Sequence, residues 1–155
     1  MTRVNAVPVS WLIDQHLVAE YREIPRVRPA ALRWARLGRP GPPPSERYVL
    51  GPGHVRFFYV RLGWLAARHR ALVAEMRDRG FAVNLPPLEP PPPGVLPDLP
   101  WDPPSTAALV CVARLEARTR EMTRPPRYRG DVVGRDHYGG MPFRYVLPTR
   151  GDLCP

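Results

Sequence analysis

Apolar residues recur at helical spacing in three stretches of the chain. In the first stretch, Leu17, Tyr21 and Ile24 follow the i, i+4, i+7 pattern of a buried helix face. This helix is expected to begin between residues 10 and 14 and to end near residue 37. Pro25 lies inside it and is expected to kink it, because proline lacks a backbone N–H and its ring clashes with the preceding turn. The kink predicts a concave site nearby.

The second stretch predicts a helix from about residue 54 to residue 79, with Gly80 as its C-terminal cap. Its apolar positions alternate by four and three, as expected of a buried seam. His69 falls in this seam and is expected to be a hydrogen-bonded core residue. The complete seam is Phe58, Leu62, Leu65, His69, Leu72 and Met76.

The third predicted helix begins with Ser105 or Thr106 as its N-cap and ends at Pro125. Its expected inner face is Ala108, Val112, Leu115 and Thr119.

Proline separates these helical stretches. A dense block covers residues 86–104, a smaller cluster covers residues 40–44, and the long block predicts an extended connection. Strand-like alternation is nearly absent. The sequence therefore predicts an all-α, compact single domain of three main helices with long irregular, Pro-rich connections.

The chain is strongly basic, with a formal net charge of +9, and all 23 of its basic residues are arginine. This balance favours a polyanionic partner, first of all nucleic acid, although solubility alone is an alternative explanation. Cys111 and Cys154 are too few for a cysteine-based metal site, and the four histidines are scattered, so we expect no metal and no cofactor. The chain shows neither a membrane span nor a signal peptide pattern, which predicts a soluble cytoplasmic protein.

The absence of lysine has a chemical consequence. A guanidinium cannot serve as an amine nucleophile near neutral pH, whereas an α-amine has a reference pKa of about 7.7–8.0. Removal of Met1 would expose the α-amine of Thr2, which could attack C1′ of a nucleotide and form an imine. The alternative is that Thr2 is simply a common second residue.

Glu23 is the second candidate for chemistry. It lies among Arg22 and Arg26, where a carboxylate weakens the attraction for phosphates. Near an imine, it could stabilise positive charge and remove the C2′ proton. The alternative is an ordinary helix-surface ion pair with a neighbouring arginine.

Several segments resemble one known family in order along about 130 residues. The similarity lies in MTRVN with DQHLVAEYREIPRV (residues 14–27), VLGPGHVRFFY (49–59), RGF (79–81), ARLE (113–116) and RPPRYRG (124–130). They resemble the pyrimidine-dimer DNA glycosylase/AP lyase family of the phage endonuclease V type. The resemblance implies a helical domain over residues 1–130 and a metal-free enzyme for double-stranded DNA that contains ultraviolet-induced pyrimidine dimers, which we expect to be monomeric.

The resemblance also implies roles for individual residues. The nucleophile would be the Thr2 amine, and Glu23 the essential carboxylate. The family's DNA-contacting positions match Arg3, Gln15, His16, Arg22, Arg26 and Arg114. Two further DNA-contacting residues are expected: Arg118, which replaces a lysine of the family, and Tyr128, which remains from the family's aromatic segment near the lesion.

The chain departs from the family in its C-terminal part. Arg127 replaces a Trp, and residues 131–155 form a partly irregular extension beyond the family's usual end. The extension could supply a stacking surface or be a loose arm. Three alternatives stay open: the same chemistry on another base lesion or on abasic sites only, a non-catalytic damaged-DNA-binding protein, and an RNA-binding protein.

Overall fold

The computed structural model describes residues 4–51 and 53–139. It is mainly helical, which confirms the predicted all-α class, with five α-helices, three 3-10 turns and one small hairpin among these residues. The elements in chain order are η1 (Val9–Trp11), α1 (Asp14–Glu23), η2 (Ile24–Arg26), α2 (Val27–Arg36), α3 (His54–Phe57), η3 (Phe58–Val60), α4 (Leu62–Asp78), α5 (Ser105–Arg120), β1 (Arg127–Tyr128) and β2 (Asp131–Val132).

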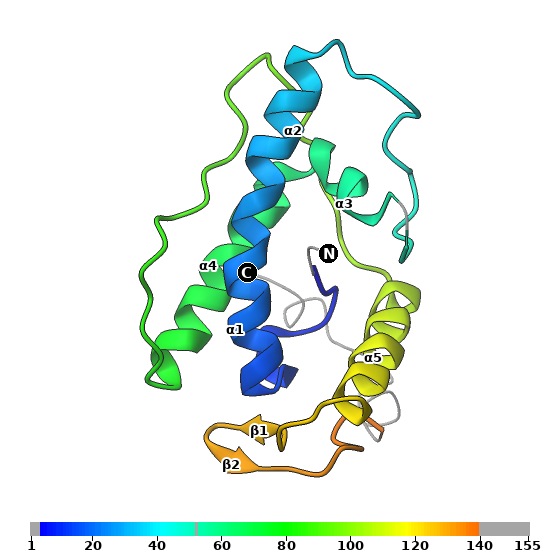
Figure 1. Cartoon of the computed structure of the whole chain (residues 1–155). Helices are drawn as coiled ribbons and strands as arrows, with labels where there is room; N and C mark the ends of the chain where they lie inside the picture. The colour runs from blue at the N-terminus through cyan, green and yellow to red at the C-terminus, as the bar shows by residue number, and fades with distance from the viewer. Residues whose placement is uncertain (1–3, 52, 140–155) are drawn as a thin grey trace.

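The predicted first helix is interrupted at Pro25, where a kink within one helix was predicted. The 3-10 turn η2 contains this proline and separates α1 from α2, which follow one another in nearly the same direction (Figure 1). Leu17, Tyr21 and Ile24 are all buried, so the predicted core face is confirmed. Of the two pockets described below, one lies at the start of α1 and the other extends along α1 to Arg22, and Pro25 lines neither.

The predicted second helix is not continuous, so this part of the prediction is wrong. It divides into α3, η3 and α4, and Arg61 at the break has φ −143° and ψ 41°. The break leaves the Val60 carbonyl to accept a hydrogen bond from Leu99 N (2.7 Å) in the Pro-rich connection. The Arg61 guanidinium folds back over the Phe57 ring and donates to the Phe57 carbonyl. Packing of the aromatic run therefore outweighs helix continuity.

The seam and the C-terminal cap of α4 are confirmed. Every predicted seam residue is buried, and Gly80 has φ +75°. Phe81 N donates to the Met76 carbonyl and Gly80 N to the Arg77 carbonyl, which is the Schellman arrangement. His69 is a core residue whose Nδ1 accepts a hydrogen bond from Leu88 N, and burial lowers its pKa. No helix among the described residues is long and apolar enough to cross a bilayer.

The third helix, α5, begins and ends differently from the prediction. Pro104 occupies the N-cap position without a side-chain hydrogen bond, so Ser105 and Thr106 are not the cap. The helix ends at Arg120, before Pro125, and the intervening residues form a loop that lines a pocket. The predicted inner face is buried at Val112, Leu115 and Thr119 and half-buried at Ala108. The Pro-rich connection forms no helix, as expected, and is held by buried Leu88 and Leu96.

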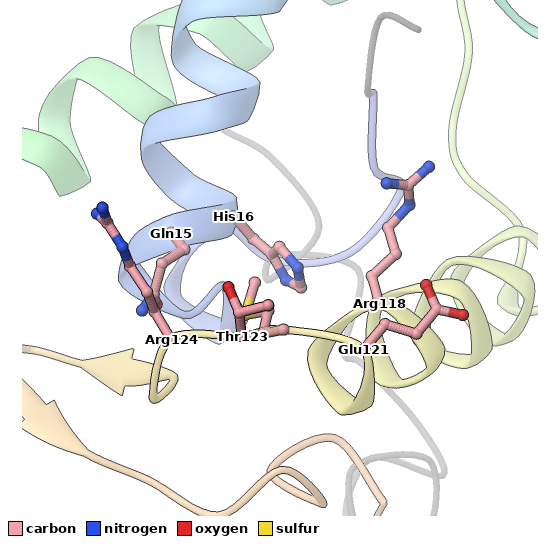
Figure 2. A pocket seen from close by; sticks show the side chains of 7 residues that line it. Gln15, His16, Arg118, Glu121, Thr123 and Arg124 are labelled. Carbon is pink, nitrogen blue, oxygen red and sulfur yellow. The ribbon is translucent and has the colours of Figure 1, made fainter.

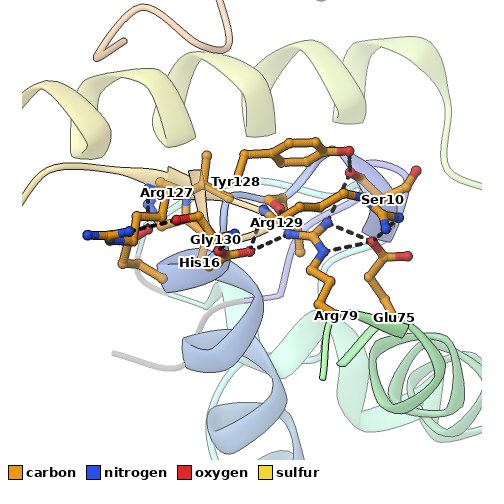
Figure 3. A network of polar contacts seen from close by, with 12 residues as sticks. Ser10, His16, Glu75, Arg79, Arg127, Tyr128, Arg129 and Gly130 are labelled. Atoms are coloured by element: carbon orange, nitrogen blue, oxygen red, sulfur yellow. Dashed lines mark hydrogen bonds and ion pairs between the residues drawn. The ribbon is translucent and has the colours of Figure 1, made fainter. Parts of the chain in front are cut away.

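An arginine and carboxylate network anchors the unpredicted hairpin to the helices (Figure 3). Asp14 begins α1 and is 6% exposed. Its carboxylate accepts hydrogen bonds from Arg79 Nη1 (2.9 Å), Arg129 N (3.1 Å) and Gly130 N (2.8 Å). The Arg79 guanidinium also lies over the Tyr128 ring, 4.7 Å from its centroid. One buried carboxylate thus joins α1, α4 and the hairpin.

Replacing this carboxylate should destabilise the protein. In Asp14→Asn, the neutral amide has one acceptor oxygen in place of two and no negative charge, so it cannot replace all three hydrogen bonds of the carboxylate. We expect a loss of about 1.5–3 kcal/mol in the free energy of unfolding, measured by urea denaturation. Asp78→Asn is the matched control, because Asp78 pairs with Arg129 (2.8 Å) while the two side chains are 60% and 48% exposed. That variant should lose less than about 1 kcal/mol. Equal losses in the two variants would contradict the anchoring role.

Candidate functional site

The N-terminal segment, residues 4–7, is a buried strip of extended chain that lies between α1 and α5 (Figure 1). Asn5 attaches it to α1 by two hydrogen bonds to the carboxylate of Glu20. The backbone N of Asn5 donates to Oε1 (3.0 Å) and its side-chain Nδ2 donates to Oε2 (2.6 Å). Asn5 is 1% exposed and Glu20 is fully buried. The position of the segment along α1 is therefore set by one carboxylate.

Arg68 of α4 balances the buried charge of Glu20. Its Nε lies 3.0 Å from Glu20 Oε1 and its Nη2 lies 3.3 Å from Oε2, and Arg68 is only 3% exposed. The same guanidinium donates to the carbonyl of Val7. Because a buried carboxylate without partners would be costly, these bonds make the interior position of Glu20 tolerable. Arg68, Glu20 and the segment form one unit.

The opposite side of the segment is held by α5 and by Tyr48. Arg114 donates to the Val4 carbonyl (3.1 Å) and to Asn5 Oδ1, and the Tyr48 hydroxyl donates to the Val4 carbonyl (2.9 Å). The backbone N of Ala6 donates to Cys111 Sγ (3.1 Å). Burial raises the pKa of the Cys111 thiol, so the sulfur is an uncharged acceptor. The segment is thus bonded on both sides.

The predicted catalytic pair is described only in part. Glu23 is half-buried and is the last residue of α1, one turn beyond Glu20, while Arg22 and Arg26 are exposed beside it. Thr2 and Arg3 lie outside the described residues.

A pocket of about 400 Å³ brings three of the predicted DNA-contacting residues together (Figure 2). Gln15 and His16 come from α1 and Arg118 from α5, and the loop after α5 closes one side. His16 points from α1 into the space between the two helices, although the residue is only 3% exposed. The other residues of the lining are Glu121, Met122, Thr123 and Arg124.

A second pocket of about 540 Å³ adjoins the first and shares Gln15 and Arg124 with it. Arg22 from α1 and Arg127 from the hairpin also line it. Gln15 connects the two elements, because its Nε2 donates to the Pro125 carbonyl (2.8 Å) and its Oε1 accepts from Arg127 N (3.0 Å). The Asp14 carboxylate in this lining is already bonded to Arg79 and the hairpin. The two linings together hold four arginines against the carboxylates of Asp14 and Glu121, so the surface around both pockets is mainly cationic.

Three predicted DNA-contacting residues line neither pocket. Arg26 lies on the turn after α1, Arg114 faces the N-terminal segment, and the Tyr128 hydroxyl donates to the Ser10 carbonyl (2.9 Å). Their DNA contacts stay predictions.

Sequence reasoning missed several residues that build the site. Asn5 and Arg68 carried no spacing signal, because their partner Glu20 lies 15 and 48 residues away in the chain. Arg124 lies in a loop, where helical periodicity gives no guidance. The RPPRYRG motif was the available signal for it, since this motif carries three arginines in seven residues.

Comparison with protein families now identifies the class to which this basic helical protein belongs. Residues 1–87 match the family model described as pyrimidine dimer DNA glycosylase. The chain therefore belongs to the pyrimidine dimer DNA glycosylase family. Membership implies a role in the repair of DNA that carries ultraviolet-induced pyrimidine dimers. The matched range contains the N-terminal segment and α1 to α4, whereas α5 and the hairpin lie beyond it.

The buried ion pair yields a stability prediction. Glu20→Gln leaves the Arg68 guanidinium without a counter-charge in the interior, and we expect a loss of about 3–5 kcal/mol in the free energy of unfolding. Glu116→Gln is the control, because Glu116 pairs on the surface with Arg120, whose side chain is 64% exposed. It should lose less than about 1 kcal/mol. Denaturant titrations followed by circular dichroism measure both values, and a Glu20→Gln protein as stable as the control would refute the anchoring of the segment.

Proposed function

We propose that the protein is a bifunctional DNA glycosylase and AP lyase that excises cyclobutane pyrimidine dimers with the α-amine of Thr2. Glu23 is the assisting carboxylate, and arginines hold the duplex. We expect it to act as a monomer in the cytoplasm, on the DNA of the nucleoid. The observation that carries the proposal is the buried attachment of residues 4–7 beside Glu20.

The direction of the N-terminal segment supports this assignment. Ser10 lies near the start of α1 and Asn5 is bonded to Glu20, so the segment runs antiparallel to α1. Followed back towards Thr2, it advances from the start of α1 towards the C-terminal end of that helix. Glu23 lies one turn further in the same direction, roughly 4.5 Å beyond Glu20 at about 1.5 Å per residue. The three residues from Asn5 to Thr2 can span up to about 10 Å. The Thr2 amine can therefore reach the level of Glu23.

The chemistry follows from these two groups. The neutral amine attacks C1′ of the 5′ nucleotide of the dimer, an N–C1′ bond forms, and the glycosidic bond breaks with its electron pair going to the base, which takes up a proton. Opening of the sugar ring leaves a protonated imine, whose positive charge the Glu23 carboxylate stabilises. Glu23 then removes a C2′ proton, and the 3′ phosphate departs. Hydrolysis of the imine releases a nicked strand with an unsaturated aldehyde and regenerates the amine.

The cationic surface around the two pockets supports a duplex partner. Arg22, Arg118, Arg124 and Arg127 lie on it, contributed by α1, α5, the loop after α5 and the hairpin. Guanidinium groups bind phosphates in a bidentate manner and remain charged at every physiological pH. The formal net charge of +9 adds long-range attraction.

A phosphate contact by Arg118 would be visible in the salt dependence of binding. In Arg118→Ala, the slope of log Kobs against log salt concentration should become shallower by about 0.9, because one fewer counterion is released. Arg36→Ala, at the C-terminal end of α2, is the control and should leave the slope unchanged. Fluorescence anisotropy at four or more salt concentrations measures both slopes. Identical slopes for the two variants would remove Arg118 from the interface.

The amine itself can be tested by reductive trapping. Sodium borohydride added during turnover should link the protein covalently to dimer-containing DNA when the N-terminus is native, because it reduces the imine to a stable amine. Protein whose α-amine has been acetylated should neither trap nor incise, while binding to the same duplex persists. Trapping by the blocked protein would overturn the proposed nucleophile. Comparing dimer-containing with abasic duplexes shows whether the glycosylase step or the lyase step alone is present.

The role of Glu23 gives a companion measurement. Glu23→Gln should lower the incision rate by about 10²–10⁴-fold, the usual range for a lost general base, and should retain affinity for damaged DNA. Glu89→Gln is the matched control, since the Glu89 side chain is 78% exposed on the Pro-rich connection, and its incision rate should equal that of the wild type. An unchanged rate in Glu23→Gln would exclude the carboxylate from the reaction.

A further inference from the structure

The first part of the C-terminal extension is packed against the helical domain. Val133 N donates to the Pro126 carbonyl (3.0 Å), and Arg135 Nη1 donates to the Arg120 carbonyl at the end of α5 (2.7 Å). The chain then places Tyr138 in the hydrophobic core, where it is fully buried. Figure 1 shows this stretch leading from β2 back beneath α5. It lies beyond the range that matches the family model.

The Tyr138 hydroxyl meets two groups of α1 and its N-cap. It accepts a hydrogen bond from Ile13 N (2.9 Å) and lies 3.1 Å from Nδ1 of His16. The rings of Tyr138 and His16 are also stacked, with centroids 5.8 Å apart and an interplanar angle of 23°. His16 is therefore held both by its ring face and by one ring nitrogen.

The position of the phenol hydrogen determines the state of the imidazole. Because the hydroxyl accepts from Ile13 N, its own hydrogen needs an acceptor, and among the described residues His16 Nδ1 is the acceptor in reach. Burial raises the pKa of Tyr138, so the hydroxyl keeps this hydrogen. A neutral imidazole that accepts this hydrogen at Nδ1 carries its own proton on Nε2.

We propose that Tyr138 is a positioning residue for DNA recognition, which fixes the orientation and the Nε2–H tautomer of His16 at the pocket between α1 and α5. This inference rests on the proposed function, because it takes the ligand to be a hydrogen-bond acceptor of the duplex. Only 3% of His16 is exposed, so the imidazole can offer the ligand no more than a narrow edge. The orientation and tautomer of the ring then determine whether that edge presents a donor.

Tyr138→Phe tests the proposal, because it removes the hydroxyl and keeps the ring that packs in the core. Long-range ¹H–¹⁵N NMR spectra at a pH where the ring is neutral report the tautomer of His16. In the wild type, Nε2 of His16 should have the ¹⁵N chemical shift of a protonated ring nitrogen. Nδ1 should have that of an unprotonated ring nitrogen. In the variant, the two shifts should move towards each other, and Kd for a dimer-containing duplex should rise about threefold to tenfold, the usual effect of one hydrogen bond.

Tyr21→Phe is the matched control. The Tyr21 hydroxyl is also on a buried tyrosine and accepts hydrogen bonds from Asn84 N and Leu85 N (2.9 and 2.7 Å). Its loss should lower the stability of the protein while leaving the His16 tautomer and the duplex affinity unchanged. A double-mutant cycle with His16→Ala gives a second readout, since Tyr138→Phe should weaken binding no further once the imidazole is absent.

The outcomes separate this proposal from the proposed function. If folded Tyr138→Phe keeps the wild-type tautomer, or if its affinity is unchanged, Tyr138 does not position His16 for DNA and the proposal is overturned, while incision by the wild type still supports the enzyme. If Tyr21→Phe shifts the tautomer equally, the effect is one of general stability and the proposal is also overturned. If the wild type neither binds nor incises dimer-containing DNA, the proposed function fails. The tautomer spectra then still decide whether Tyr138 bonds to His16.

Discussion

The buried ion pair between Glu20 and Arg68 is the interaction on which the arrangement of the site depends. It joins α1 to α4, and its carboxylate also holds Asn5 of the N-terminal segment. A charged pair in the interior is not in itself a strong source of stability, because desolvation offsets much of the attraction. The ion pair instead determines the position of the N-terminal segment, because Glu20 also accepts hydrogen bonds from Asn5 and Arg68 also donates to the Val7 carbonyl.

Two carboxylates at the N-terminal and middle parts of α1 thus perform comparable structural tasks. Glu20 fixes the segment that precedes the helix, and Asp14 fixes the hairpin that follows α5. The counter-ion of Glu20 is Arg68 of α4, and that of Asp14 is Arg79 at the C-cap of the same helix. Helix α4 and its C-cap therefore support both the N-terminal segment and the hairpin that lines the second pocket.

The sequence allowed prediction of those features that depend on local spacing. The buried face that begins in α1 and the buried seam of α4 were predicted correctly, because both depend on apolar residues three or four positions apart in the chain. The break at Arg61 was not predictable, because it depends on a hydrogen bond from Leu99, far away in the chain, and on aromatic packing. For the site, Gln15, His16 and Arg118 were named in advance and lie together, although the resemblance to the family, and not the spacing, identified them. The Glu20 network and Arg124 depend on tertiary contacts that no local pattern encodes.

The contact between Ala6 and Cys111 has a consequence for the dynamics of the protein. The Cys111 sulfur is completely covered, and the N-terminal segment supplies part of that cover through its backbone N–H. Movement of the segment away from α5 would expose the thiol and, at the same time, open the hydrogen bonds around Asn5. Residues 4–7 of the N-terminal segment therefore cannot leave their place without local unfolding of the core, so the stability of the core also determines how firmly this segment is held.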